Sequence, residues 1–213
     1  MYSIDVAFER LDEQDRKILQ DVMSREWKVK KVLILGPGKG RIGIALALLG
    51  FEVVAVDLED HTAFYETISS TLNFPKPIIF KQVSISDACK ELASNQFSLV
   101  LAQRVIHYLP YPEAIQLVQN ISRIMNKGAS FWFSISPLHS DMGENYLCAQ
   151  KSIDQRFCTI APEIQKRFNL YAPVCLYEQS EVENLLNKSH LIKHDLYITS
   201  FGNIKGHYKK TTQ

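Results

Sequence analysis

The sequence predicts an α/β fold, a three-layer sandwich in which helices cover both faces of a mostly parallel, seven-stranded sheet. Short apolar runs alternate five times with segments of helical periodicity, and a glycine-rich turn follows the first run. Two strand-like segments joined by a short turn close the chain. The alternation indicates parallel strands, and the closing pair indicates a C-terminal antiparallel hairpin.

The length of 213 residues suits a single domain over residues 1–213. A formal net charge of +1 argues against nucleic acid or an anionic membrane as a partner, and leaves the oligomeric state open. No apolar run approaches the roughly 20 residues of a membrane-spanning helix, and the charged N-terminus lacks the apolar core of a signal peptide. Four widely spaced cysteines predict reduced thiols in a cytoplasmic protein.

The first third of the chain begins with charged and apolar residues at helical spacing over about 5–24. This N-terminal helix is expected to cover the sheet or, alternatively, to close over a bound ligand. Residues 32–35 form a continuously apolar strand, residues 41–49 resume at helical spacing, and residues 52–56 form a second apolar strand. Residues 32–57 are therefore predicted to form a strand, a turn, a helix and a second strand.

The turn between the first strand and its helix contains Gly36, Pro37, Gly38 and Gly40. Small residues let a ligand approach the backbone, and the helix N-terminus offers free N–H groups to an anionic group. Asp57 ends the second strand, where a carboxylate can accept hydrogen bonds from ribose hydroxyls. The unit predicts a site for a cofactor that contains a nucleoside.

The rest of the chain continues the alternation, apart from one long irregular segment. We expect helices at 62–72 and 88–93, from Pro112 until Gly128, and from Ser180 onward. The expected strands are 78–83, 97–102, 129–135, 191–199 and 204–210. The carboxyl ends of the parallel strands should line one cleft.

Residues 136–176 interrupt this order and hold one short predicted helix, at about 162–168. Irregular segments of this length are typical of functional covers and binding loops, so we interpret this one as a substrate-side insertion. Tyr146 and the other aromatic residues of the insertion either line a pocket for an acceptor or form a private core.

Several of these features resemble the class I S-adenosylmethionine-dependent methyltransferases, a family with a Rossmann-like fold. They are LGPGKG at residues 35–40, the acid after the second strand, Asp87 after the third, and the closing hairpin. The resemblance covers residues 32–135 and returns at 180–210, and it implies S-adenosyl-L-methionine as cofactor and methyl transfer to a small-molecule acceptor. The implied cofactor-binding residues are Gly36, Pro37, Gly38, Gly40, Asp57, Leu58, Asp87, Ala88 and Gln103.

The sequence departs from the family at Ile34 and Ser98, where the family often has an acid. The loss at Ile34 removes a charge that can help to orient the cofactor, and so bears on affinity more than on the identity of the cofactor. A catalytically degenerate module that binds the cofactor without turnover is therefore one alternative function.

A second alternative is an NAD(P)-binding oxidoreductase, because Gly38, Gly40 and Gly43 satisfy the dinucleotide pattern G-x-G-x-x-G. The register counts against it. The dinucleotide fingerprint places its first glycine directly after the strand, and counting from Gly36 puts Arg41 at the sixth position.

Methyl transfer depends mainly on alignment, and a general base helps only for protonated or weakly acidic acceptors. His107, just past the fourth strand, is the first candidate for that base, and the adjacent Tyr108 is a candidate substrate contact, as is Tyr146. His139, after the fifth strand, is the second candidate base. The structural alternative for His107 and Tyr108 is that both cover the sheet edge or cap the turn at Pro110–Pro112. We expect no metal site, because no pair of His or Cys residues shows ligand spacing.

Overall fold

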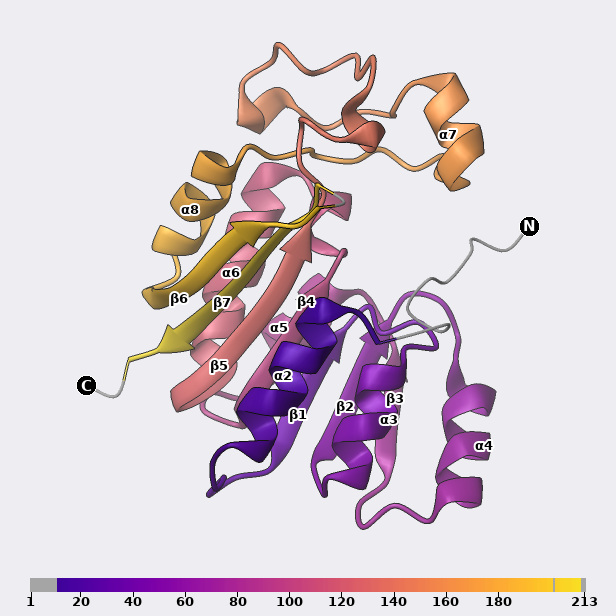
Figure 1. The fold of residues 1–213 in the computed structure, drawn as a ribbon, viewed down its shortest axis with the longest axis vertical. Coiled ribbons are helices and arrows are strands. Elements are labelled where there is room, and N and C mark those ends of the chain that lie inside the picture. Colours follow the sequence, from indigo (N-terminus) through magenta and orange to yellow (C-terminus); the bar gives the residue numbers. More distant parts are fainter. Residues whose placement is uncertain (1–10, 201, 212–213) are drawn as a thin grey trace.

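The computed structural model describes residues 11–200 and 202–211. These residues form a seven-stranded sheet, in the order β3-β2-β1-β4-β5-β7-β6, with helices on both faces (Figure 1). Strands β1 to β5 pair in parallel, whereas β7 pairs antiparallel with both β5 and β6. The predicted three-layer α/β fold with a C-terminal antiparallel hairpin is confirmed.

The central strands are almost fully buried because helices cover both of their faces. The strands are β1 (Lys31–Leu35), β2 (Glu52–Asp57), β3 (Ile78–Gln82), β4 (Phe97–Gln103), β5 (Met125–Ile135), β6 (Leu191–Ile198) and β7 (Ile204–Lys210). β5 starts earlier than predicted, because Met125 pairs with Phe97 of β4. Gly128, predicted to end the preceding helix, lies inside β5 with a φ of +75°.

The two faces of the sheet have separate apolar cores. Helices α2, α3 and α4 cover one face, and α5, α6 and α8 cover the other. The helices are α2 (Glu13–Met23), α3 (Arg41–Leu48), α4 (Thr62–Leu72), α5 (Ile85–Glu91), α6 (Tyr111–Ile124), α7 (Pro162–Phe168) and α8 (Gln179–Asn187). None of the helices within residues 11–200 and 202–211 has the length and apolar character to cross a membrane.

The N-terminal helix α2 is shorter than the predicted span of 5–24, of which residues 5–10 lie outside the described residues. It begins after Asp12 because Asp12 and Asp15 form a capping box. The Asp15 backbone N–H donates to Asp12 Oδ1 over 3.0 Å, and the Asp12 N–H donates to Asp15 Oδ2 over 2.9 Å. The helix packs Ile18 and Val22 into the core of its face of the sheet.

Residues 136–176 lie beyond the carboxyl edge of the sheet and contain α7 (Figure 1). They have an apolar core of their own, to which Leu138, Tyr146, Ile160 and Val174 contribute. The buried Arg156 ties this insertion to α8, because its Nη1 lies 2.6 Å from Glu181 Oε2. The same guanidinium also donates to the carbonyls of Lys151 and Leu176, and an ion pair of such low exposure holds a fixed geometry better than an exposed one.

A disulfide joins Cys148 to Cys158 inside the insertion, so the prediction of reduced thiols was wrong for these two residues. Their separation of 10 residues in an irregular segment gives no periodic signal for pairing, and they meet because the segment folds back on itself. Cys89 and Cys175 are free and buried, and burial raises the pKa of each thiol to about 12. The cytoplasmic location was predicted partly from reduced thiols, and the disulfide removes that argument.

The disulfide should stabilise the insertion. For a loop of this length, loss of the cross-link is expected to lower the free energy of unfolding by about 2–3 kcal/mol, or about 5–10 °C in Tm for a domain of this size. Thermal unfolding of the wild type with and without dithiothreitol measures the effect. The Cys148→Ser/Cys158→Ser double variant is the control, since its Tm should be low and unaffected by the reductant. An equal Tm of the wild type in both conditions would contradict the prediction.

Candidate active site

The candidate site lies at the carboxyl edge of the sheet, beside the ends of β1 and β4. These neighbouring strands lie where the strand order reverses, because β1 leads through α3 to β2 on one side while β4 lies on the other. Ligands of open α/β sheets bind at this switch point, where loops diverge and leave backbone groups exposed. The residues predicted for cofactor binding come from the loops at this edge.

The glycine turn after β1 requires glycine at two positions, since Gly36 has a φ of +64° and Gly38 a φ of +50°. The Gly36 N–H donates to the Val56 carbonyl over 2.8 Å, which fixes the turn to the end of β2. A Cβ atom on Gly36 would lie 2.1 Å from Val105 Cγ1. The loop after β4 therefore packs directly on the glycine turn.

The Asp57 carboxylate connects the glycine turn to the loop after β2. Its Oδ2 accepts a hydrogen bond from the Gly38 N–H over 3.0 Å, and its Oδ1 accepts one from the Glu59 N–H over 3.2 Å. On the other side, Tyr65 Oη donates to the Gly38 carbonyl over 2.8 Å. A carboxylate can accept about four hydrogen bonds, so Asp57 keeps acceptor capacity for ribose hydroxyls. The next side chain, Leu58, is 70% exposed and offers an apolar surface at the same edge.

Asp87 and Ala88 lie in the first turn of α5. Ser84 caps this helix, its Oγ accepting from the Asp87 N–H over 3.0 Å and donating to Asp87 Oδ2 over 2.7 Å. The hydrogen bond from Ser84, followed by the Lys90 ammonium, lowers the pKa of Asp87. Ala88 is buried, and its N–H donates to the Ser84 carbonyl. An adenine at this edge would therefore meet the Asp87 carboxylate rather than the Ala88 side chain.

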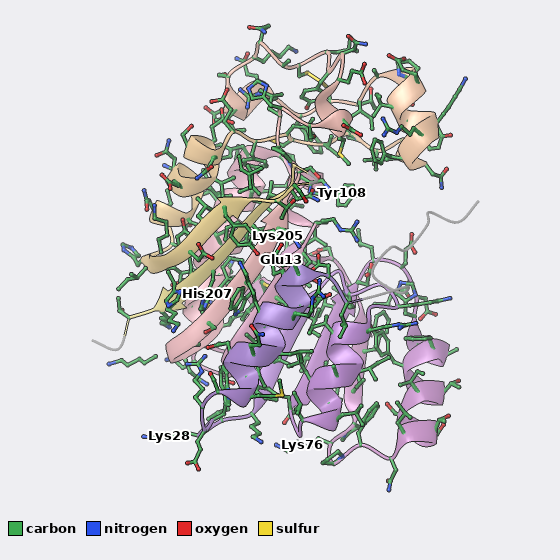
Figure 2. The ribbon with its side chains drawn as sticks, viewed as in Figure 1. Glu13, Lys28, Lys76, Tyr108, Lys205 and His207 are labelled. Carbon is green, nitrogen blue, oxygen red and sulfur yellow. A yellow bond between two sulfur atoms is a disulfide. The ribbon has the colours of Figure 1, made fainter. Side chains whose placement is uncertain are left out.

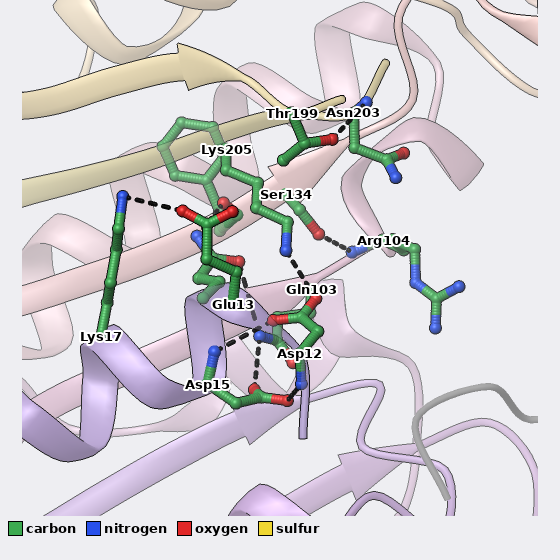
Figure 3. A network of polar contacts seen from close by, with 12 residues as sticks. Asp12, Glu13, Asp15, Lys17, Gln103, Arg104, Ser134, Thr199, Asn203 and Lys205 are labelled. Atoms are coloured by element: carbon green, nitrogen blue, oxygen red, sulfur yellow. Dashed lines mark hydrogen bonds and ion pairs between the residues drawn. The ribbon is translucent and has the colours of Figure 1, made fainter. Parts of the chain in front are cut away.

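The Gln103 side chain, predicted to face the cofactor, binds the first turn of α2 (Figure 3). Its Nε2 donates to Asp15 Oδ1 over 2.9 Å and to Gln14 Oε1 over 3.4 Å. The Lys205 ammonium of β7 binds Asp12, the N-cap of the same helix. A polar network thus joins β4, α2 and β7 next to the switch point.

Burial acts on both acids of this network. It raises the pKa of Asp15 above its usual value, and the hydrogen bonds to Asp15 only partly offset it. Burial also acts to raise the pKa of Asp12. The hydrogen bond from Lys205 and the backbone hydrogen bonds outweigh this effect, so the pKa of Asp12 is lowered. This network was not predicted from the sequence, although the spacing of Asp12 and Asp15 is that of a capping box. The long-range partners Gln103 and Lys205 have no sequence signal.

His107 and Tyr108 both lie in a short 3-10 helix (Ile106–Tyr108) after β4, with ring centroids 4.4 Å apart. His107 is 1% exposed, and burial, with a smaller contribution from the Arg104 guanidinium, lowers its pKa to about 3. No hydrogen-bond partner of its Nδ1 occurs in the described part of the chain. Its imidazole is neutral near pH 7 and a weak proton acceptor. Tyr108 is 43% exposed and extends from the sheet edge below the insertion (Figure 2).

The other two predicted residues lie elsewhere. His139 is exposed, with its Nε2 3.9 Å from Glu178 Oε1, and lines a cavity of about 310 Å³ between the start of α8 and the β6–β7 hairpin. Tyr146 is buried in the core of the insertion, where its hydroxyl donates to the Val174 carbonyl over 2.6 Å. That placement favours the structural alternative for Tyr146. His107 is buried and His139 is exposed, and their roles as bases stay predictions.

Burial of His107 should make the protein less stable in mild acid. The unfolded state takes up a proton near pH 6.5 and the folded state only near pH 3, so stability rises with pH between these values. Between pH 7.5 and 5.5 we expect His107 to account for a loss of about 1.4 kcal/mol in the free energy of unfolding. Urea denaturation at the two pH values measures it.

A His107→Gln variant should lose this part of the pH dependence, while His139→Gln, at an exposed position, should retain it. Equal pH dependence in the wild type and the His107→Gln variant would contradict the assignment. Other buried groups, among them His207 with a pKa of about 3, contribute equally to all three proteins.

Comparisons with known proteins agree with this geometry. Residues 33–133 match the model of a family described as "Methyltransferase domain". A comparison with curated protein sequences finds no match. Among solved structures, a SAM-dependent methyltransferase from Methanosarcina mazei is 15% identical, with a TM-score of 0.67 over 91% of this chain and 98% of that one.

Two further structures have the same fold. The 1,6-didemethyltoxoflavin-N1-methyltransferase of Burkholderia thailandensis, solved with 1,6-didemethyltoxoflavin and S-adenosylhomocysteine, is 18% identical, with a TM-score of 0.66 over 98% of this chain and 80% of that one. The magnesium protoporphyrin IX methyltransferase of Synechocystis, solved with SAM, is 12% identical, with a TM-score of 0.64 over 93% and 79%. Residues 33–133 thus match a family of methyltransferase domains, and the chain has the fold of S-adenosylmethionine-dependent methyltransferases over most of its length.

Proposed function

We propose that the protein transfers the methyl group of S-adenosyl-L-methionine to a small-molecule acceptor. The observation that carries the proposal is the pairing of the Asp57 carboxylate with the Gly38 N–H at the switch point of the sheet. It places an acid for ribose hydroxyls beside a turn whose backbone a ligand can approach closely. The register of the turn, with Arg41 and not glycine at the sixth position from Gly36, favours the methyl donor over a dinucleotide.

Each part of the cofactor has a candidate partner in this site. Gly36 and Gly38 offer the backbone of the turn, Asp57 the acceptor for the ribose, and the exposed Leu58 an apolar contact for the adenine. Asp87 offers a carboxylate for the amino group of the adenine. When bound, the sulfonium supplies a methyl group that is already activated, so the protein has to align the acceptor and exclude water.

The acceptor side of the proposal rests on the loop after β4 and on the insertion. We propose Tyr108 as the residue that contacts the acceptor, because its ring is exposed and lies on the loop whose Val105 packs against Gly36 of the glycine turn. His107 stays neutral and acts as a positioning residue behind Tyr108. A small acceptor agrees with the net charge of +1 and with the fold relative whose structure holds 1,6-didemethyltoxoflavin.

Binding of S-adenosylhomocysteine tests the cofactor assignment. We expect the wild type to bind it with micromolar Kd in calorimetric titration, and Asp57→Ala to weaken binding by about 10- to 100-fold, because a hydrogen bond to a charged group is worth about 1.5–3 kcal/mol. Glu59→Gln is the matched control, since it removes a neighbouring charge but keeps the backbone N–H that binds Asp57. It should change the Kd less than twofold.

No binding by the wild type at millimolar ligand would refute the proposal. A rise in Tm with NAD(P) but not with S-adenosylhomocysteine would support the oxidoreductase alternative. Binding without transfer to any acceptor would support the degenerate module.

The Tyr65 hydroxyl should help to hold the glycine turn for the cofactor. In a Tyr65→Phe variant the Gly38 carbonyl loses this donor, while the ring keeps its stacking on Phe80, at 5.4 Å between centroids. We expect the Kd for S-adenosylhomocysteine to rise about 2- to 10-fold, because a neutral hydrogen bond contributes about 0.5–1.5 kcal/mol. The Tm reports whether the variant stays folded. An unchanged Kd would show that the turn keeps its shape without this contact.

A further inference from the structure

The loop after β4 contains one cationic side chain, that of Arg104, to which the proposed cofactor site assigns no role. Arg104 follows the last residue of β4 and is exposed. Figure 3 shows its guanidinium directed away from the network that surrounds Gln103. Among residues 11–200 and 202–211, no hydrogen bond or ion pair to this guanidinium is formed.

The backbone of Arg104 is held in a conformation that arginine rarely adopts. Its φ is +55°, whereas the other described non-glycine residues with positive φ are asparagines and one histidine, types that tolerate this region. The Arg104 N–H donates to both the carbonyl and the Oγ of Ser134, over 2.9 and 3.0 Å. Backbone strain of this kind persists where the surrounding structure requires it, and it is concentrated at functional sites.

This loop is next to the place that the methyl donor would occupy. Val105, directly after Arg104, packs so closely on Gly36 that the turn has no room for a side chain. Three residues further along lies Tyr108, which is half exposed on the same loop. The guanidinium of Arg104 lies near both rings, and its charge acts on the pKa of each. Burial lowers the pKa of His107 and Arg104 lowers it further, whereas burial raises the pKa of Tyr108 and Arg104 partly offsets that rise.

No acid among residues 11–200 and 202–211 forms an ion pair with Arg104, and the acids of the neighbouring segments have other partners. Asp57 is bound to the Gly38 turn, and Asp12 is paired with Lys205. Asp15 accepts hydrogen bonds from the Gln103 amide and the Asp12 N–H. On the insertion, Asp141 pairs with Arg167. Arg104 therefore remains an uncompensated cation beside an exposed aromatic ring.

We propose that Arg104 binds an anionic group, a carboxylate or a phosphate, on the acceptor molecule, and that Tyr108 contacts the part of the acceptor next to that group. A guanidinium binds either anion through two parallel hydrogen bonds, which fixes orientation as well as position. Such a contact would align the acceptor for an in-line displacement beside the glycine turn. The inference rests on the proposed methyl transfer, because only then does an acceptor have to lie there.

Calorimetric titration with two anionic probes and one neutral probe tests the inference. The probes are benzoate, phenyl phosphate and benzamide, added to protein saturated with S-adenosylhomocysteine at constant ionic strength. We expect at least one of the anions to bind the wild type tenfold or more tightly than benzamide. In Arg104→Gln this preference should disappear, while the Kd for S-adenosylhomocysteine should stay within twofold.

Arg16→Gln is the matched control, because it removes one exposed positive charge from α2 without touching the loop after β4. It should keep the full preference for the anion. The inference is overturned if neither anion binds more tightly than benzamide, or if Arg104→Gln binds them as the wild type does. It is also overturned if Arg104→Gln weakens S-adenosylhomocysteine tenfold, since Arg104 would then serve the cofactor.

The outcome also separates the inference from the proposal on which it rests. If the wild type binds no S-adenosylhomocysteine, methyl transfer itself is refuted and the inference is refuted with it. If the wild type binds S-adenosylhomocysteine but shows no preference for the anions, only the inference is refuted.

Discussion

The hydrogen bond between Asp57 and the Gly38 N–H is the interaction on which the rest of the site depends. It joins the loop after β1 to the loop after β2, two segments that the sheet only brings near each other. The left-handed backbone of Gly36 and Gly38 makes this approach possible, since any other residue at Gly36 would collide with Val105. Once the turn is closed, its backbone, the acid and the exposed Leu58 face the same edge.

A second set of contacts fixes the other half of this edge. The first turn of α2 binds β4 through Gln103 and β7 through Lys205, and Gln14 Nε2 donates to the Phe133 carbonyl of β5 over 2.8 Å. These elements are far apart in sequence, and Gln14 and Lys205 are buried, so that a missing partner of either would be costly. The end of β4, from which Arg104 and Tyr108 project, is thereby held between two rigid elements.

The order of elements could be predicted from the sequence. A buried parallel strand such as β1 is a continuous apolar run, and the apolar residues of α6 recur at helical spacing. The sequence was also sufficient for the glycine turn and Asp57, whose spacing follows from local geometry. It failed where the outcome depends on residues distant in the chain. Met125 is a strand residue only because Phe97 lies opposite, and Gln103 turns toward α2 only because Asp15 is there.

The insertion has its own apolar core and its own covalent cross-link, and it is joined to the rest of the fold by Arg156–Glu181 and by the Cys175 N–H, which donates to the His107 carbonyl. Part of its stability therefore comes from contacts within the insertion itself. Substitutions in the core of the insertion can reshape the surface beyond the carboxyl edge of the sheet without disturbing the packing that holds the glycine turn. Sequence divergence between relatives of this protein should be concentrated in the insertion. The choice of acceptor could then change while the glycine turn and Asp57 stay constant.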